Sequence, residues 1–282
     1  MEYITLANGY KLPLLGYGTL HIPPKQTKEC VLNALKEGYR LIDTAASYFN
    51  EKEIGEAIKE SKIKREDIYL TTKVWVQDAG YEKTLKAFNK SLDNLGVDYI
   101  DLYLIHQPYG DYYGSWKALE ELYLQGKVKA IGVCNFSPER LMDLYLNSQI
   151  HPMINQIEYH PFYQPQQQLC VMKQCCCQVE AWGPLNEGQR DIFNHPVLLE
   201  IAKKHQKTVS QIILRWHLDN QIIAIPKTIH LERMKENMNI FDFKLDQEDQ
   251  EKIKQLDLGY SEIIDHQNYM TAKWLNKYKI HD

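Results

Sequence analysis

Four side chains suited to proton transfer occur within the first 106 residues of the chain. Asp43, Lys73 and His106 each stand at the end of a short apolar run rich in β-formers, and Tyr48 lies five residues after Asp43. If these runs are neighbouring parallel strands of one barrel, the four side chains meet at its C-terminal rim. A carboxylate, a phenol, an ammonium and an imidazole placed together can deliver a proton to an oxygen atom.

Each of the four has a distinct expected part in that chemistry. A free phenol has a pKa near ~10, and a nearby ammonium lowers the pKa by stabilising phenolate. We expect Lys73 to lower the pKa of Tyr48, Asp43 to keep Lys73 charged, and His106 to orient a carbonyl oxygen. Such a set protonates the oxygen while a hydride adds to the carbon behind it. In a second interpretation Lys73 forms a Schiff base with a carbonyl substrate, as aldolases do.

The elements that must position these side chains alternate regularly along the chain. Asn8-Gly9 predicts an N-terminal β-hairpin within residues 1–13. Apolar runs predict strands at 14–18, 40–43, 68–73, 100–106, 128–133, 153–157, 178–182 and 222–225. Helical spacing and end signals predict helices at 27–37, 51–59, 80–95, 116–124, from Ser137, and at 166–174, 196–205, 209–218 and 231–239.

Eight strand-then-helix units in a chain of 282 residues predict an α/β fold, a (β/α)8 TIM barrel, as one domain over 1–282. The competing fold is a doubly wound open sheet. That fold would place a G-x-G-x-x-G turn after an early strand, and the sequence contains none.

Composition narrows the function classes. A net charge of −4 without a basic run argues against nucleic-acid binding, and no apolar stretch reaches the ~20 residues of a membrane helix. The first residues lack a signal-peptide pattern, so we expect a cytoplasmic protein. Six cysteines, three of them consecutive at 175–177, form no paired C-x-x-C motif. We therefore predict reduced cysteines and no metal site.

Eight short motifs resemble those of the aldo-keto reductases, in order and from the hairpin to about Leu258. They are Gly38–Ala45, Tyr48–Glu51, Thr71–Trp75, Leu104–Pro108, Gly132–Phe136, Asn155–Glu158, Glu180–Leu185 and Ile225–Thr228. The chain is most similar to the compact bacterial-type members. The resemblance implies NADPH-dependent reduction of aldehydes or ketones, with Tyr48 as the acid, Lys73 tuning it, Asp43 as the partner of Lys73, and His106 orienting the substrate.

The resemblance also implies a cofactor site. Asn135 and Gln156 would hold the nicotinamide carboxamide, and the ring of Trp182 would stack on the nicotinamide. Lys227 and Arg233 suit the phosphate on the adenosine ribose, which favours NADPH over NADH. The remaining implied cofactor contacts are Gly18, Thr19, Leu20, Asp43, Cys134, Gly183, Pro184, Leu185, Ile225, Pro226, Thr228, Glu236 and Asn237.

Three positions depart from the family pattern. Cys134 stands where serine is common, Leu20 where an aromatic residue is common, and Phe49 where glycine is common. The implied substrate pocket consists of Leu20, Tyr48, Phe49, Trp75, His106 and Tyr109. The tail at 259–282 is a candidate cover for this pocket, with Trp274 as its expected anchor.

We expect a small-molecule carbonyl substrate as the binding partner, and a monomer or weak dimer. A barrel that binds NADPH for a regulatory or structural role, without useful turnover, is the alternative from a different functional class.

Overall fold

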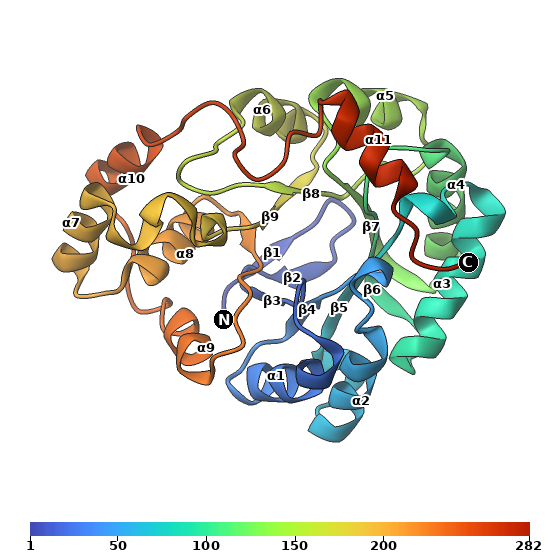
Figure 1. Ribbon diagram of the computed structural model, residues 1–282, viewed down its shortest axis with the longest axis horizontal. Coiled ribbons are helices and arrows are strands. Elements are labelled where there is room, and N and C mark those ends of the chain that lie inside the picture. Colours follow the sequence, from blue (N-terminus) through green and yellow to red (C-terminus); the bar gives the residue numbers. More distant parts are fainter.

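The computed structural model describes all 282 residues, and its centre is a ring of parallel strands (Figure 1). Eight strands are hydrogen-bonded in the order β10-β9-β8-β7-β6-β5-β4-β3. A single parallel bridge between Leu15 and Ala224 joins the two ends. The strands are β3 (Gly16–Gly18), β4 (Leu41–Asp43), β5 (Tyr69–Val74), β6 (Ile100–Ile105), β7 (Val128–Cys134), β8 (Ile154–Glu158), β9 (Gln178–Trp182) and β10 (Ile223–Ala224). The predicted (β/α)8 barrel is confirmed.

Helices follow the strands and surround the ring (Figure 1). They are α1 (Pro24–Lys36), α2 (Glu51–Ser61), α3 (Tyr81–Leu95), α4 (Tyr112–Leu124), α5 (Pro138–Asn147), α6 (Gln166–Gln174), α7 (Pro196–His205), α8 (Val209–Asp219), α9 (Leu231–Met238), α10 (Gln247–Lys254) and α11 (Tyr269–Lys277). Short 3₁₀ turns occupy Ala46–Tyr48, Arg65–Asp67 and Val76–Asp78, and Asn186–Asn194 contains two turns separated by a kink. None of the helices combines the length and apolarity that crossing a bilayer requires.

The barrel closes at its shortest strands, and this explains where strand predictions run too long. The predicted strand at 222–225 shrinks to the two residues of β10, and the one at 14–18 shrinks to Gly16–Gly18. At this seam the Leu15–Ala224 bridge and two backbone hydrogen bonds, from Ala224 to Leu14 and from Gly18 to Pro226, join the strands, so no regular ladder extends over the predicted lengths. α10 and α11, outside the eight units, were not predicted.

The predicted hairpin pairs β1 (Tyr3–Thr5) with β2 (Lys11–Pro13) and crosses the middle of the ring (Figure 1). The Tyr10 hydroxyl donates to Asp101 Oδ1 at 2.6 Å, and the Asn8 amide donates to the carbonyl of Lys129 at 2.9 Å. Both partners stand near the start of their strands, so the hairpin covers the N-terminal end of the barrel. The opposite end is left for the functional side chains.

Strand register brings the predicted catalytic residues to that opposite end. Asp43 of β4 pairs with Thr71 of β5. Lys73, two residues after Thr71 on β5, points to the same side of the sheet and lies nearer the C-terminal end of the barrel. Lys73 in turn pairs with Leu104, and His106 again lies two residues beyond. Because side chains alternate between the faces of a strand, these residues all point into the barrel.

The helical layer packs tightly at Gly55 of α2. A Cβ atom at this position would lie 2.2 Å from the carbonyl oxygen of Leu95, at the end of α3. Since a backbone atom cannot yield as a flexible side chain does, α2 would have to move away from α3. A glycine is therefore required here despite its low helix propensity.

We predict that Gly55→Ala lowers the free energy of unfolding by about 2 kcal/mol, because overpacking exceeds the ~1 kcal/mol that alanine gains in helix propensity. Urea denaturation measures the change. Lys59→Ala, at an exposed position of the same helix, serves as the control and is expected to stay within about 0.5 kcal/mol of the wild type. A Gly55→Ala variant as stable as the wild type would contradict the packing argument.

Candidate active site

A cavity of 1540 Å³ opens at the C-terminal end of the barrel, and Tyr48, His106 and Asp43 line it. Its wall continues from Trp182 to the segment after β10 and on to α9, and the C-terminal tail contributes Ile263, Ile264, His266, Thr271, Trp274, Leu275 and Tyr278. The cavity thus has one region around the four predicted catalytic residues and a second that extends toward α9.

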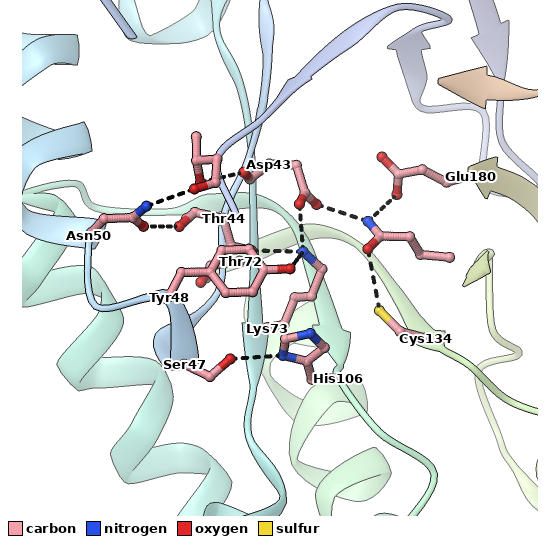
Figure 2. Close-up of polar contacts among 12 residues, drawn as sticks. Asp43, Thr44, Ser47, Tyr48, Asn50, Thr72, Lys73, His106, Cys134 and Glu180 are labelled. Atoms are coloured by element: carbon pink, nitrogen blue, oxygen red, sulfur yellow. Dashed lines mark hydrogen bonds and ion pairs between the residues drawn. The ribbon is translucent and has the colours of Figure 1, made fainter. Parts of the chain in front are cut away.

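Lys73 is the centre of the polar contacts in the first region (Figure 2). Its ammonium, completely buried, lies 2.6 Å from Asp43 Oδ1 and 2.9 Å from the carbonyl oxygen of Thr44. It also lies 3.4 Å from the hydroxyl of Tyr48. An ammonium has three protons, so these three oxygens use its full donor capacity.

The loop that carries Tyr48 is held to the strands on either side. The hydroxyl of Thr44 donates to Asn50, whose amide donates to the carbonyl of Thr19, while the Thr19 hydroxyl donates to the carbonyl of Asp43 (Figure 2). All three bonds are buried. They fix the loop between Asp43 and α2, and with it the distance from the Tyr48 hydroxyl to Lys73.

Phe49 ends this loop with a left-handed backbone, at φ 58° and ψ 28°. A bulky side chain is unfavourable in that conformation, which glycine adopts freely. Phe49 is 52% exposed and lines the cavity, so its ring forms part of the cavity surface that glycine would leave open.

His106 lies against both Tyr48 and Trp75, with ring centroids 5.5 Å and 5.1 Å away. Its Nδ1 is 3.3 Å from the hydroxyl of Ser47, and its carbonyl oxygen accepts from the amide of Asn135 at 3.2 Å. No protein group bonds Nε2. When Ser47 donates to Nδ1, the ring proton resides on Nε2 and is available to a ligand.

Burial decides the protonation states of these residues. It raises the pKa of Tyr48 above its ordinary value, more than the attraction of Lys73 lowers it. Burial favours the neutral amine of Lys73, but the charge of Asp43 prevails, and the pKa of Lys73 is raised. Burial and the charge of Lys73 hold the pKa of His106 well below its ordinary value. Lys73 acts on the pKa of Tyr48 in the expected direction, but burial outweighs it, so at neutral pH Tyr48 retains its proton.

Gln156 connects Asp43 to a second buried acid, Glu180. Its amide nitrogen donates to Asp43 Oδ2 at 2.9 Å and to Glu180 Oε2 at 3.1 Å. These two bonds fix the orientation of the amide, and the thiol of Cys134 lies 4.0 Å from its oxygen (Figure 2). Burial and the charge of Asp43 raise the pKa of Glu180 to about 8. Glu180 was not singled out as a site residue in the sequence.

The second region of the cavity carries cations that form no ion pair. Lys227, after β10, and Arg233, in the first turn of α9, line the wall, and no carboxylate lies within salt-bridge distance of either. Asn135 accepts a hydrogen bond from the indole of Trp182 at 2.8 Å, which fixes both beside His106. Two free cations and an ordered aromatic ring in one cavity fit a phosphorylated ligand with a flat ring.

Most of the residues predicted to bind the cofactor or the substrate line this one cavity. In addition to those above, these are Gly18, Leu20, Phe49, Trp75, Gly183, Pro184, Leu185, Ile225, Pro226, Thr228, Glu236 and Asn237. Three predicted contacts are not in the lining, namely Thr19, Cys134 and Tyr109. The first two lie behind Asp43 and Gln156, and Tyr109 packs with Trp75 and Leu275.

The tail has a different anchor from the expected Trp274, which is 56% exposed. Leu275 is buried, and the indole of Trp75 donates to the carbonyl of Tyr278 at 2.7 Å.

His266 and Gln107 also line the cavity without having been predicted, as do Ser47 and the segment 207–210 before and at the start of α8. Of these, only Gln107 lies in a recognised motif, so sequence spacing gave no signal for the rest.

The model of the aldo/keto reductase family matches residues 14–258. The chain belongs to the aldo/keto reductase family. It is 47% identical over 257 residues to the glyoxal reductase of Bacillus subtilis, covering 90% of this chain and 92% of that protein. The predicted family and the predicted enzyme class, an oxidoreductase, are confirmed.

Solved structures of aldo-keto reductases agree with this assignment. MGS-M4, from a Medee basin deep-sea metagenome library, is 46% identical with a TM-score of 0.92, over 94% of this chain and 98% of that one. The Bombyx mori enzyme, solved in complex with NADP, is 32% identical with a TM-score of 0.88, over 94% of this chain and 95% of that one.

The raised pKa of Glu180 predicts how this aldo-keto reductase loses stability with pH. Between the ordinary value of 4.5 and about 8, the folded protein keeps a proton that the unfolded chain releases. The free energy of unfolding contributed by Glu180 therefore falls as pH rises through this window. Glu180→Gln removes the titration while keeping the shape and the acceptor for Gln156.

We expect the stability of Glu180→Gln relative to the wild type to increase from pH 5 to pH 7.5, by about 1 kcal/mol per pH unit. Urea denaturation at several pH values measures the difference. Glu82→Gln, on the exposed surface of α3, is the control and should show a constant difference. A constant difference for Glu180→Gln as well would contradict the raised pKa.

Proposed function

We propose that the protein catalyses the NADPH-dependent reduction of aldehydes or ketones to alcohols, with Tyr48 as the general acid. The observation that carries the proposal is the 3.4 Å approach of the Tyr48 hydroxyl to the buried Lys73 ammonium, inside a cavity that also contains His106 and Trp182. When bound, NADPH supplies the hydride from C4 of its nicotinamide ring.

The protein's own residues complete the reaction by handling the proton. His106 donates from Nε2 to the carbonyl oxygen and orients it beside the Tyr48 hydroxyl. Tyr48, protonated at neutral pH, transfers its proton to that oxygen as negative charge develops. Lys73 stabilises the phenolate that remains, and Asp43 keeps Lys73 charged and in place.

The cofactor is expected to lie along the rest of the cavity. Trp182 offers its face to the nicotinamide, and the amides of Asn135 and Gln156 are positioned for the carboxamide. Gln156 has both its protons engaged by Asp43 and Glu180, so its oxygen is the atom left to contact the cofactor. Lys227 and Arg233 are the groups for the phosphate on the adenosine ribose.

The Schiff-base alternative conflicts with the state of Lys73. A nucleophilic lysine needs a neutral amine with a free lone pair. Here the charge of Asp43 raises the pKa of Lys73, and all three protons of the ammonium are engaged.

The alternative of a barrel without useful turnover is tested by measuring the loss of NADPH absorbance with a panel of aldehydes and ketones. Glyoxal belongs in that panel because the Bacillus subtilis relative is named for it.

The monomeric or weakly dimeric state and the cytoplasmic location remain predictions from the sequence.

Replacement of the acid gives the direct test. Tyr48→Phe should lower kcat/KM for a good aldehyde by about 10³-fold, within the range for loss of general acid catalysis. The dissociation constant for NADPH, measured by quenching of tryptophan fluorescence, should stay within about twofold because the ring remains. Tyr3→Phe, on the hairpin at the other end of the barrel, is the matched control. Turnover by Tyr48→Phe at the wild-type rate would refute the assignment.

A separate test addresses the phosphate contacts. Arg233→Ala should weaken NADPH binding by about tenfold or more, the loss of one charge-assisted interaction, and should leave NADH binding unchanged. Lys235→Ala is the control on the same helix, because Lys235 pairs with Glu232 and does not line the cavity. Equal weakening of both nicotinamides by Arg233→Ala would contradict a phosphate-specific role.

A further inference from the structure

Glu180 is a completely buried acid that the proposed mechanism does not use. It stands on β9, where it pairs with Gln156 of β8. Its Oε2 accepts from the Gln156 amide at 3.1 Å, while its Oε1 has no hydrogen-bond partner within the protein. The amide of Gln156 is thus the one polar group that the side chain contacts. A buried carboxyl group is unfavourable in comparison with a leucine of similar size, so packing alone does not account for an acid at this position.

Glu180 reaches the cavity only through Gln156. The amide nitrogen of Gln156 has two protons, and it donates them to Asp43 Oδ2 at 2.9 Å and to Glu180 Oε2 at 3.1 Å (Figure 2). Gln156 lines the cavity, and Glu180 does not. With both protons engaged inside the barrel, the amide oxygen is the atom that Gln156 offers to a ligand. The thiol of Cys134, 4.0 Å from that oxygen, is only a weak donor.

The protonation state of Glu180 agrees with such a role. Burial, followed by the charge of Asp43, raises the pKa of Glu180 to about 8, so the side chain is mostly neutral at pH 7. A neutral carboxyl group still accepts through its carbonyl oxygen. Glu180 can therefore hold the second amide proton of Gln156 without placing another negative charge near the ion pair of Asp43 and Lys73.

We infer that Glu180 is a positioning residue, which holds the second amide proton of Gln156 and thereby restricts Gln156 to accepting a hydrogen bond from the cofactor. The group selected in this way is a primary carboxamide, such as that of the nicotinamide ring, because its N–H can donate to the Gln156 oxygen. A ketone in place of the carboxamide has no proton to donate and leaves that oxygen unpaired. The inference rests on the cofactor site of the proposed function, and it concerns binding of the cofactor rather than the reaction.

The test compares NADP⁺ with its 3-acetylpyridine analogue, in which a methyl ketone replaces the carboxamide. The measured quantity is the dissociation constant of the analogue divided by that of NADP⁺, from quenching of tryptophan fluorescence at pH 7. Glu180→Leu keeps a similar volume and removes the acceptor. The freed N–H of Gln156 is unfavourable against leucine, so it turns toward the ligand and can donate to the ketone. We expect the ratio to fall about tenfold, the effect of one hydrogen bond at a specificity site.

Further variants separate this role from a structural one. Glu180→Gln is neutral and keeps a carbonyl oxygen for Gln156, so it should retain the wild-type ratio. Glu180→Met is a second apolar replacement and should lower the ratio as Glu180→Leu does, which keeps the test available if leucine prevents folding. Val179→Ala, the preceding residue of β9 with its side chain on the opposite face of the strand and outside the cavity lining, is the matched control. It should lower Tm and leave the ratio unchanged.

A ligand without the nicotinamide supplies the internal reference. The compound 2′-phospho-ADP-ribose has the adenosine and phosphate groups of NADP⁺ and lacks its ring, so its dissociation constant should be the same for the wild type and every Glu180 variant. Parallel weakening of all three ligands leaves the ratio unchanged and contradicts a role directed at the carboxamide.

An unchanged ratio in the folded apolar variants overturns the inference. A ratio lowered as much in Glu180→Gln as in Glu180→Leu also overturns it, because the acceptor for Gln156 is still present there. Wild-type protein that binds NADPH and oxidises it with no carbonyl compound overturns the proposed function alone, since the ratio is measured without turnover. Wild-type protein that binds neither dinucleotide overturns both.

Discussion

The buried ion pair between Lys73 and Asp43 is the interaction on which the rest of the site depends. Lys73 is fully buried, and a charge in that position is strongly unfavourable unless a partner and further hydrogen bonds compensate it. Asp43 provides the charge at 2.6 Å, and the carbonyl of Thr44 and the Tyr48 hydroxyl complete the shell. The register of β4 against β5 and the hydrogen-bonded loop from Thr44 to Asn50 must therefore both form before the phenol and the ammonium can meet.

The same burial controls every other ionisable group at the centre. It raises the pKa of Tyr48 and of Glu180 and lowers the pKa of His106, so each of these groups is driven toward its neutral form. The ion pair is then the principal charge in the site, and its own net charge is zero. In the proposed mechanism, the neutral phenol of Tyr48 would keep its proton until an oxygen atom nearby begins to carry negative charge. Burial thus keeps the proton on Tyr48 at rest, and Lys73 would stabilise the phenolate once the proton has been transferred.

The sequence predicted what strand ends and turns determine, and it missed what depends on packing between distant segments. Asp43, Lys73 and His106 were found because each follows an apolar run, and parallel strands bring such ends together.

Cys134 is the last residue of β7 and points inward beneath Gln156. The match to a motif did not reveal that Cys134 lies behind the cavity wall. Lys73 lowers the pKa of Tyr48 as expected, but solvent exclusion outweighs this effect, and the extent of burial cannot be read from residue spacing. α10 has one buried apolar residue, Ile253, which is too weak a pattern to predict a helix.

The cavity joins two chemically different ends, and this division explains how binding and reaction can be separated. Toward α9 the wall carries Lys227 and Arg233 without carboxylate partners, an arrangement that attracts a phosphorylated ligand over a long range. At the other end the groups are neutral, aromatic or engaged in the ion pair, and the tail contributes Leu275 and Tyr278 to the wall. Strong charge at the reacting end would compete with Lys73 for the developing phenolate or for the carbonyl oxygen. In the proposed reaction, cations kept at the far end would supply affinity without disturbing the electrostatics by which Tyr48 would act as an acid.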